Sequence, residues 1–221
     1  MTLPRPDVIG SYTVDGKMHF YGSRRTELDR AGVSMVRTLK SFNFDPGSVI
    51  TNVSLTPEVV QFAPFEYAVQ ILGMYGTNAD LSPFDAGRVE SLSRQFDPVA
   101  MIGIGKETLE GLEMLGHDAK TVFRGRTVWA RPDAYEAVKV LPEVDARRCV
   151  IAGPVLLLEC ARGKLHLDSR EWIAESENDQ LLLTSRQVRS EPLQRLATGV
   201  AAQVSEEACA CGNHDMVIEL L

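Results

Sequence analysis

Three cysteines and one histidine in the C-terminal third of this 221-residue chain have side chains that could bind a metal ion. Cys160 precedes His166 by six positions, and Cys209 and Cys211 are separated by one residue. Zinc prefers thiolate and imidazole ligands, and four of them around the ion form a closed site with no open position for an activated water. We therefore predict a structural zinc site at these four residues. His214 is an alternative fourth ligand.

Residues in the middle of the chain could bind a small molecule. Trp129 is suited to the wall of an aromatic pocket, and Arg124 and Arg126 could hold a carboxylate or phosphate. The alternatives are core packing for the tryptophan and a solvated turn for the arginines. His19 and His117 are possible general bases by their usual pKa, but the sequence identifies no partner for either. No catalytic residue is assigned, since we find no Ser-His-Asp order, HExxH helix or Walker loop.

The composition is that of a globular protein with enough apolar residues for a core. Hydrophobic residues make up 44% of the chain and charged residues 24%. The net charge of −7 argues against a nucleic-acid-binding surface, which would be basic. No apolar run approaches the ~20 residues of a membrane-spanning helix, and the first ten residues do not resemble a signal peptide. We expect a cytoplasmic protein that binds neither nucleic acid nor membranes.

The elements that must position these residues alternate between strands and helices up to about residue 152. A hairpin of residues 8–13 and 17–21 is predicted around Asp15-Gly16, followed by a helix over 24–42. Further strands are predicted at 48–54, 77–81, 99–104, 121–124 and 148–152, and helices at 64–75, 83–96, 106–115 and 132–141. Beyond Gly153-Pro154 only short strands are predicted, at 155–159, 164–167, 171–174 and 181–184.

This order predicts an α/β fold. Strands that alternate with helices favour a mostly parallel or mixed sheet with helices on its faces. The closely spaced strands that follow predict a smaller β-rich C-terminal lobe. We accordingly divide the chain into an α/β core of residues 1–152 and a β-rich lobe of residues 153–221 that carries the probable zinc site.

Several segments resemble motifs of the acyl-adenylating (adenylate-forming) superfamily, and the resemblance is nearest to phenylacetate–coenzyme A ligase. Residues 10–17 (GSYTVDGK) stand at the position of the family's phosphate loop. Residues 153–166 contain GP, EC and LH in the order of the family's GP…EC…GLH passage. Residues 182–184 (LLT) resemble its GElvvT strand. Residues 192–199 (PLQRLATG) resemble its PLIRYRTGD passage, and CACG follows at 209–212, as in the phenylacetate branch.

The departures from these motifs all concern ATP. Tyr12 and Val14 are bulky where a phosphate loop needs small residues, and Asp15 places a carboxylate where phosphates would bind. Residues 146–150 (ARRCV) replace the family's Tyr-Gly-x-x-Glu motif. Val200 stands where the resemblance implies an acidic residue for the ribose hydroxyls. The family's C-terminal domain, with its adenylation lysine, is expected to be absent.

The resemblance therefore implies a relative of the aryl/acyl-CoA ligases that has lost adenylation. We expect it to bind or transform an acyl or aromatic intermediate without ATP in a specialised, natural-product-like biosynthetic pathway. The alternative is a non-catalytic interaction subunit that completes a split ligase or a biosynthetic complex. Loss of the flanking domains would expose apolar surface, which predicts a homodimer.

Overall fold

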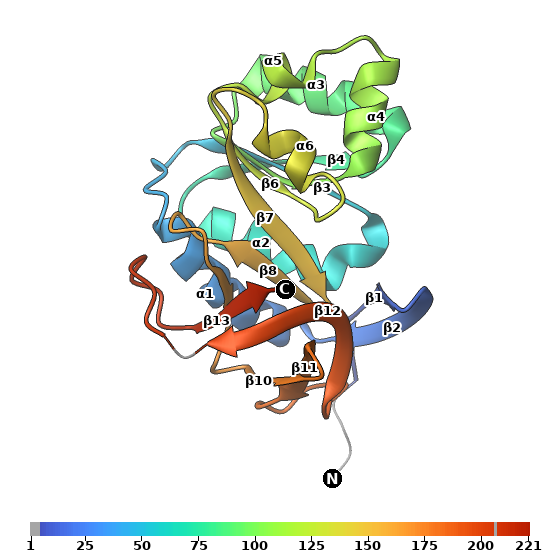
Figure 1. Cartoon of the computed structure of the whole chain (residues 1–221), viewed down its shortest axis with the longest axis vertical. Helices are drawn as coiled ribbons and strands as arrows, with labels where there is room; N and C mark the ends of the chain where they lie inside the picture. Colours follow the sequence, from blue (N-terminus) through green and yellow to red (C-terminus); the bar gives the residue numbers. More distant parts are fainter. Residues whose placement is uncertain (1–4, 206) are drawn as a thin grey trace. The chain divides into compact units, whose positions relative to one another are not determined.

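The computed structural model describes residues 5–205 and 207–221 (Figure 1). The chain forms two compact units. The first contains the chain up to Phe42, Thr56–Ala68 and Ile151–Leu221, and the second contains Asn43–Leu55 and Val69–Val150. The sequence-based division places one boundary after residue 152, so that each part is a continuous segment. The compact units of the structure are discontinuous in sequence, because the N-terminal hairpin and its helix belong to the same unit as the C-terminal strands.

The second unit is built on a parallel sheet. Its strands lie in the order β7-β6-β5-β3-β4, and every neighbouring pair is parallel. The strands are β3 (Val49–Ser54), β4 (Tyr75–Asp80), β5 (Ala100–Ile104), β6 (Thr127–Ala130) and β7 (Asp145–Ala152), the last of which continues into the first unit. The helices are η2 (Pro83–Asp85), α3 (Ala86–Phe96), α4 (Lys106–Met114), α5 (Ala119–Phe123) and α6 (Tyr135–Lys139). β5 is buried along its whole length, as expected for a central strand of a parallel sheet.

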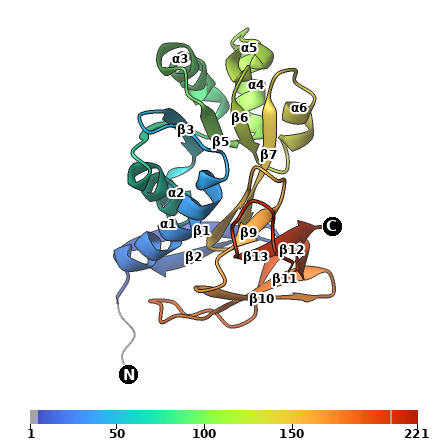
Figure 2. The ribbon, with the colours of Figure 1, turned by 90° about the vertical axis from the view of Figure 1, so that its left-hand side faces the viewer.

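The first unit combines a hairpin, two helices and an antiparallel sheet (Figure 2). The hairpin joins β1 (Val8–Val14) to β2 (Lys17–Ser23) and is followed by α1 (Arg25–Lys40). η1 (Thr56–Glu58) leads into α2 (Val59–Ile71). The sheet has the order β10-β11-β12-β13-β9-β8. Its strands are β8 (Val155–Glu159), β9 (Leu165–Leu167), β10 (Trp172–Glu177), β11 (Gln180–Ser185), β12 (Leu196–Ser205) and β13 (Met216–Leu220). The predicted fold class, a mixed α/β fold with a β-rich C-terminal part, is confirmed.

The structure corrects several predicted elements. Residues 121–124 are not a strand but lie largely in α5, because the Asp118 side chain accepts from the Lys120 N–H and caps a helical turn. The strand of this region is β6, which follows α5. Pro64 does not begin its helix but lies inside α2. β12 and β13 were not predicted; in β12 small and polar residues dilute the apolar alternation that marks a strand.

In the described ranges, 5–205 and 207–221, no helix has both the length and the apolar character needed to cross a membrane.

Candidate metal centre and ligand pockets

The structure brings the four predicted metal ligands together in the first unit. One ligand atom from each of Cys160, His166, Cys209 and Cys211 lies within 4.8 Å of all the others. Cys160 follows β8, His166 lies on β9, and the other two cysteines lie between β12 and β13. The sulfurs of Cys160 and Cys209 are 3.8 Å apart, and Cys211 Sγ is 3.3 Å from His166 Nε2. Sulfurs placed tetrahedrally at 2.3 Å from zinc are separated by about 3.8 Å, so the group fits the ion closely.

Two glycine turns present the thiols. After Cys160 the chain turns at Gly163 (φ +73°), whose N–H donates to the Cys160 carbonyl. The Arg162 N–H donates to Cys160 Sγ at 3.4 Å. In the second turn Asn213 N–H donates to Cys211 Sγ, also at 3.4 Å. Backbone N–H groups aimed at sulfur favour the thiolate, which is the form that binds metal.

The imidazole is oriented from its other nitrogen. His166 Nδ1 lies 3.4 Å from the carbonyl oxygen of Asp215 and can donate its proton there. Nε2 then directs its lone pair at the thiols, an arrangement typical of metal-bound histidines. His214, the alternative ligand, is exposed and is not among the four clustered residues.

One face of α1 holds both turns in place. Arg37 makes a charged hydrogen bond to the buried carboxylate of Asp215, with Nε 2.9 Å from Oδ2. Ser34 donates to the same carboxylate at 3.0 Å. Ser41 Oγ, just beyond the helix, accepts from the Ala161 N–H in the first turn. Because these positions recur at helical spacing, the order of the metal site is connected to the order of α1.

The neighbouring thiols have opposed titration behaviour. Burial alone would raise the pKa of Cys160, but hydrogen bonds from His166 and from the backbone outweigh it, so the pKa lies below the usual value. Burial raises the pKa of Cys211 to about 12, and the adjacent thiols add to that shift. A bound divalent cation would remove this conflict by stabilising all three thiolates together.

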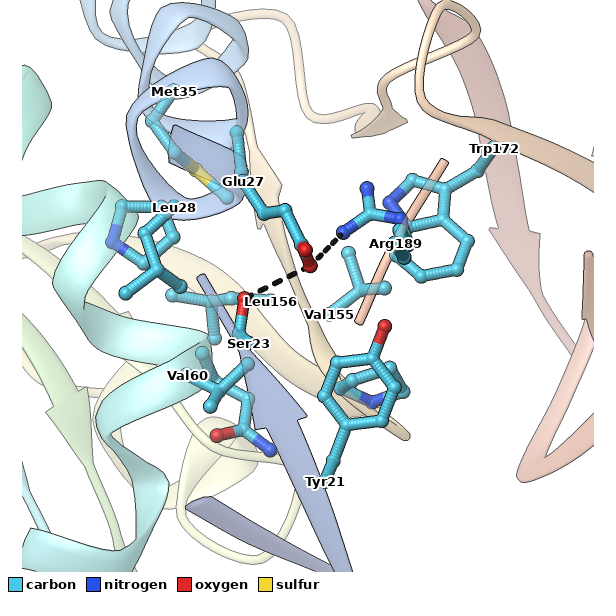
Figure 3. A pocket seen from close by; sticks show the side chains of 14 residues that line it. Tyr21, Ser23, Glu27, Leu28, Met35, Val60, Val155, Leu156, Trp172 and Arg189 are labelled. Atoms are coloured by element: carbon cyan, nitrogen blue, oxygen red, sulfur yellow. Dashed lines mark hydrogen bonds and ion pairs between the residues drawn. The ribbon is translucent and has the colours of Figure 1, made fainter. Parts of the chain in front are cut away.

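A second feature of the first unit is a small pocket lined by buried charges (Figure 3). The Glu27 carboxylate lies between Ser23, whose hydroxyl donates to it, and Arg189 (Figure 3). Arg189 also pairs with Glu171 at 2.7 Å, and its guanidinium lies 4.1 Å from the centre of the Trp172 ring. All five of these side chains are buried.

This pocket is too small for an acyl or aromatic ligand. Its volume is about 30 Å³, enough for about one or two waters. The two buried carboxylates are paired with two arginines, because the exposed Arg30 also bonds to Glu171, at 2.7 Å. These ion pairs therefore connect α1 to the start of β10 and to the segment after β11. The sequence offered no signal for it, since charges in the first turns of a helix usually face solvent.

Tyr21 lines this pocket and should make the protein sensitive to alkali. Burial, opposed by the nearby Arg189, raises the pKa of Tyr21 from 10 to about 12. A raised pKa means that the fold favours the neutral phenol, so the stabilisation is complete below pH 10 and is lost between pH 10 and about 12. Tyr21→Phe should therefore make the free energy of unfolding less dependent on pH in this window, by about 1 kcal/mol per pH unit. Urea unfolding at pH 9, 10 and 11 measures the difference; parallel pH profiles for the two proteins would contradict it.

The second unit contains a larger hollow. Its volume is about 240 Å³, and it is lined by Glu90, Ser93, Arg94, His117, Asp118, Thr121, Val122 and Arg126. Arg126 is the most buried of its cations: the side chain is 10% exposed, with Nη2 2.8 Å from the exposed carboxylate of Asp97. Arg94 is paired with Glu90 at 3.0 Å.

Of the three residues predicted to bind substrate, only Arg126 lines this hollow. Arg124 is exposed and pairs with Glu143 at 3.0 Å. Trp129 is completely buried on β6, edge-on to Phe44 with ring centres 6.4 Å apart. His117, a possible base, is half-buried in the lining.

Comparison with solved structures identifies the fold. The chain resembles 2-hydroxyisobutyryl-CoA ligase in an open conformation with 2-HIB-AMP and CoA, with a TM-score of 0.74 and 10% identity over 98% of this chain. The same ligase in its thioesterification state gives a TM-score of 0.70 and 11% identity. The chain spans 56% and 51% of these two ligase chains. No protein-family model matches, and no curated protein is significantly similar. The fold is therefore that of the adenylate-forming acyl-CoA ligases, represented over about half their length.

Proposed function

We propose that this protein is a non-adenylating relative of the aryl/acyl-CoA ligases that binds or transforms an acyl or aromatic intermediate without ATP. A specialised biosynthetic pathway is the setting we favour, and the GP, EC and CACG motifs are our reason for proposing the phenylacetate–CoA ligase branch as its nearest relatives. The observation that carries the proposal is an apolar cluster at the point where three segments resembling nucleotide motifs meet.

The three segments meet within the first unit. They are the β1–β2 hairpin, the Gly153 turn and the start of β12. A Cβ built on Gly153 would lie 2.9 Å from Leu196 of β12 and 3.9 Å from Tyr12 of the hairpin. A Cβ built on Gly199 would lie 3.4 Å from Val14. Apolar side chains thus fill the place where the resemblance implies a nucleotide. The cluster consists of Tyr12, Tyr21 and Val60 with Val8, Val14, Leu28, Val59, Ile151, Leu193 and Leu196.

The hairpin is also too regular to surround a phosphate. All seven residues of β1 are paired with β2, and the connection is the two-residue turn Asp15-Gly16, with φ values of 50° and 72°. A turn of this kind leaves no wide loop of free N–H groups, and its tip carries a carboxylate. At the position implied for ribose binding, the Val200 side chain cannot accept a hydrogen bond, and its N–H donates to Thr198 Oγ1.

For the ligand we propose the 240 Å³ hollow of the second unit. Arg126 would hold the carboxylate of an acyl or aromatic acid by displacing the exposed Asp97 side chain. For the metal centre we propose zinc in a structural role, since four protein ligands leave no position for substrate. The second candidate function, a non-catalytic interaction subunit, is favoured by the exposed apolar side chains of the hairpin, Ile9, Met18 and Phe20.

We expect no ATP-dependent chemistry. Pyrophosphate exchange should remain at background with a panel of aryl and acyl acids, and millimolar ATP or AMP should not raise the melting temperature. The apolar cluster and Asp15 are the physical reasons. Exchange that depends on an added acid would contradict the proposal.

The same acids should raise the melting temperature of the unmodified protein. Arg126→Met should abolish that rise, whereas Arg124→Met, on an exposed side chain two residues away, should preserve it. The ligand-free melting temperature of each variant serves as the folding control. If the acids no longer raise the melting temperature of either variant, the hollow is not the binding site and this part of the proposal is wrong. If no acid binds and the protein instead copurifies with one defined partner, the interaction-subunit function would replace the first.

A further inference from the structure

Three buried polar atoms in the small pocket of the first unit have no hydrogen-bond partner. They are Tyr21 Oη, Gln61 Oε1 and Arg189 Nε, and all three residues line the pocket of about 30 Å³ (Figure 3). The residues are at most 4% exposed. No residue in the described parts of the chain, 5–205 and 207–221, bonds to any of these atoms. Buried polar groups are nearly always hydrogen-bonded, so the partners should come from a molecule bound in the pocket.

The amide of Gln61 is held in one orientation. Its Nε2 donates to the carbonyl oxygens of Ser11 and Gly153, each at 3.1 Å. A flipped amide would place Oε1 against two acceptors, so Oε1 is the atom that lacks a partner. An amide oxygen only accepts hydrogen bonds. The bound molecule must therefore be able to donate one.

The other two atoms require the opposite property. Arg189 Nε can only donate, and Nη2 of the same guanidinium is already bonded to Glu171 at 2.7 Å. Tyr21 Oη can donate and accept. Arg189 and the phenol are neighbours, but neither Tyr21 Oη nor Arg189 Nε is satisfied by the other. The bound molecule must therefore also be able to accept a hydrogen bond.

We propose that the pocket is a hydration site, in which one or two ordered water molecules bridge Gln61 Oε1 to Tyr21 Oη and Arg189 Nε. Water both donates and accepts, so it can satisfy all three atoms. A simple anion cannot donate to Gln61, and a cation cannot accept from Arg189. The volume agrees, since a buried water needs about 10–15 Å³ of such space. The carboxylates beside the pocket are already paired with arginines, so no unbalanced charge favours an ion.

The bridge would join three segments that are distant in sequence. Tyr21 lies on β2, Gln61 on α2, and Arg189 in the segment after β11. Through Gln61 the bound water would also be connected to the backbone of β1 and of the Gly153 turn. The pocket is then a fixed part of the fold of the first unit and does not serve as a place for substrate.

A high-resolution crystal structure of the unmodified protein tests the identity of the bound molecule. Density should lie about 2.5–3.2 Å from Gln61 Oε1 and from Tyr21 Oη or Arg189 Nε. Crystals grown in rubidium bromide should show no anomalous signal in the pocket, because either ion scatters anomalously and water does not. A pocket without density, a Gln61 Oε1 bonded to another residue, or an anomalous peak would overturn the proposal.

Solution measurements test the bridge to the phenol. Magnetic relaxation dispersion of solvent oxygen detects water molecules that are trapped inside a protein and gives their residence time. Tyr21→Phe keeps the ring but removes one partner of the water, so the residence time should shorten about fivefold. Tyr75→Phe, at a residue of β4 that is 67% exposed, should leave it unchanged. No trapped water in the unmodified protein, or equal residence times in all three proteins, would contradict the proposal.

Discussion

Cys211→Ser should remove most of the bound zinc and lower the melting temperature by about 10 °C or more. The four side chains come together only when β8, β9 and the segment before β13 are folded, so binding of an ion there would contribute directly to the free energy of folding. Elemental analysis of protein purified without added metal, together with calorimetry, measures both effects. Cys149→Ser is the control, because Cys149 is a free cysteine that lies outside the cluster; this variant should retain full zinc content.

Removal of zinc from the unmodified protein with a chelator should lower the melting temperature in the same way. Hydrogen exchange should then show which segments lose structural protection. Removal of the ion frees the two glycine turns, so amide protection should fall in the second half of α1, whose Ser34 and Arg37 bond to Asp215. Zinc below about a tenth of an equivalent, with all four thiols freely titratable in the folded protein, would eliminate the site. Zinc loss without any change in α1 would retain the site but contradict its connection to the helix.

Arg189→Met should destabilise the protein by about 3–5 kcal/mol. The substitution leaves the carboxylates of Glu27 and Glu171 buried with less compensation, and removing one member of a buried ion pair typically has an effect of this size. Arg195→Met is the matched control. Arg195 also pairs with two glutamates, Glu175 and Glu177, but its side chain is 44% exposed, so its loss should change stability far less than the loss of Arg189.

Urea unfolding monitored by fluorescence provides the measurement. Adding Glu27→Gln to the Arg189→Met variant should restore part of the lost stability, because it removes one of the uncompensated charges. If Arg189→Met and Arg195→Met lower the free energy of unfolding equally, the buried ion pairs stabilise the protein no more than exposed ones do, and the prediction is wrong.

The local elements and the cluster of four candidate metal ligands could largely be predicted from the sequence. Cys160, His166, Cys209 and Cys211 were identified because zinc ligands are few in kind and their residue types are distinctive. The hairpin was identified from Asp15-Gly16, since both residues tolerate positive φ. The parallel sheet of the second unit followed from the alternation of apolar strands with helices. In each case the determining information lies within a few neighbouring residues.

Contacts between distant segments could be decided only by the tertiary structure. Glu27 is an ordinary surface residue by its position in α1, and only the return of the chain at Ser190 and Arg189 buries it. Trp129 has the kind of side chain that often lines an aromatic pocket, yet it is completely buried in the core of its unit. Arg126, by contrast, lines the hollow. Sequence periodicity indicates which face of an element is buried. It does not indicate which distant side chain will cover that face, because that choice depends on how segments separated by more than a hundred residues pack together.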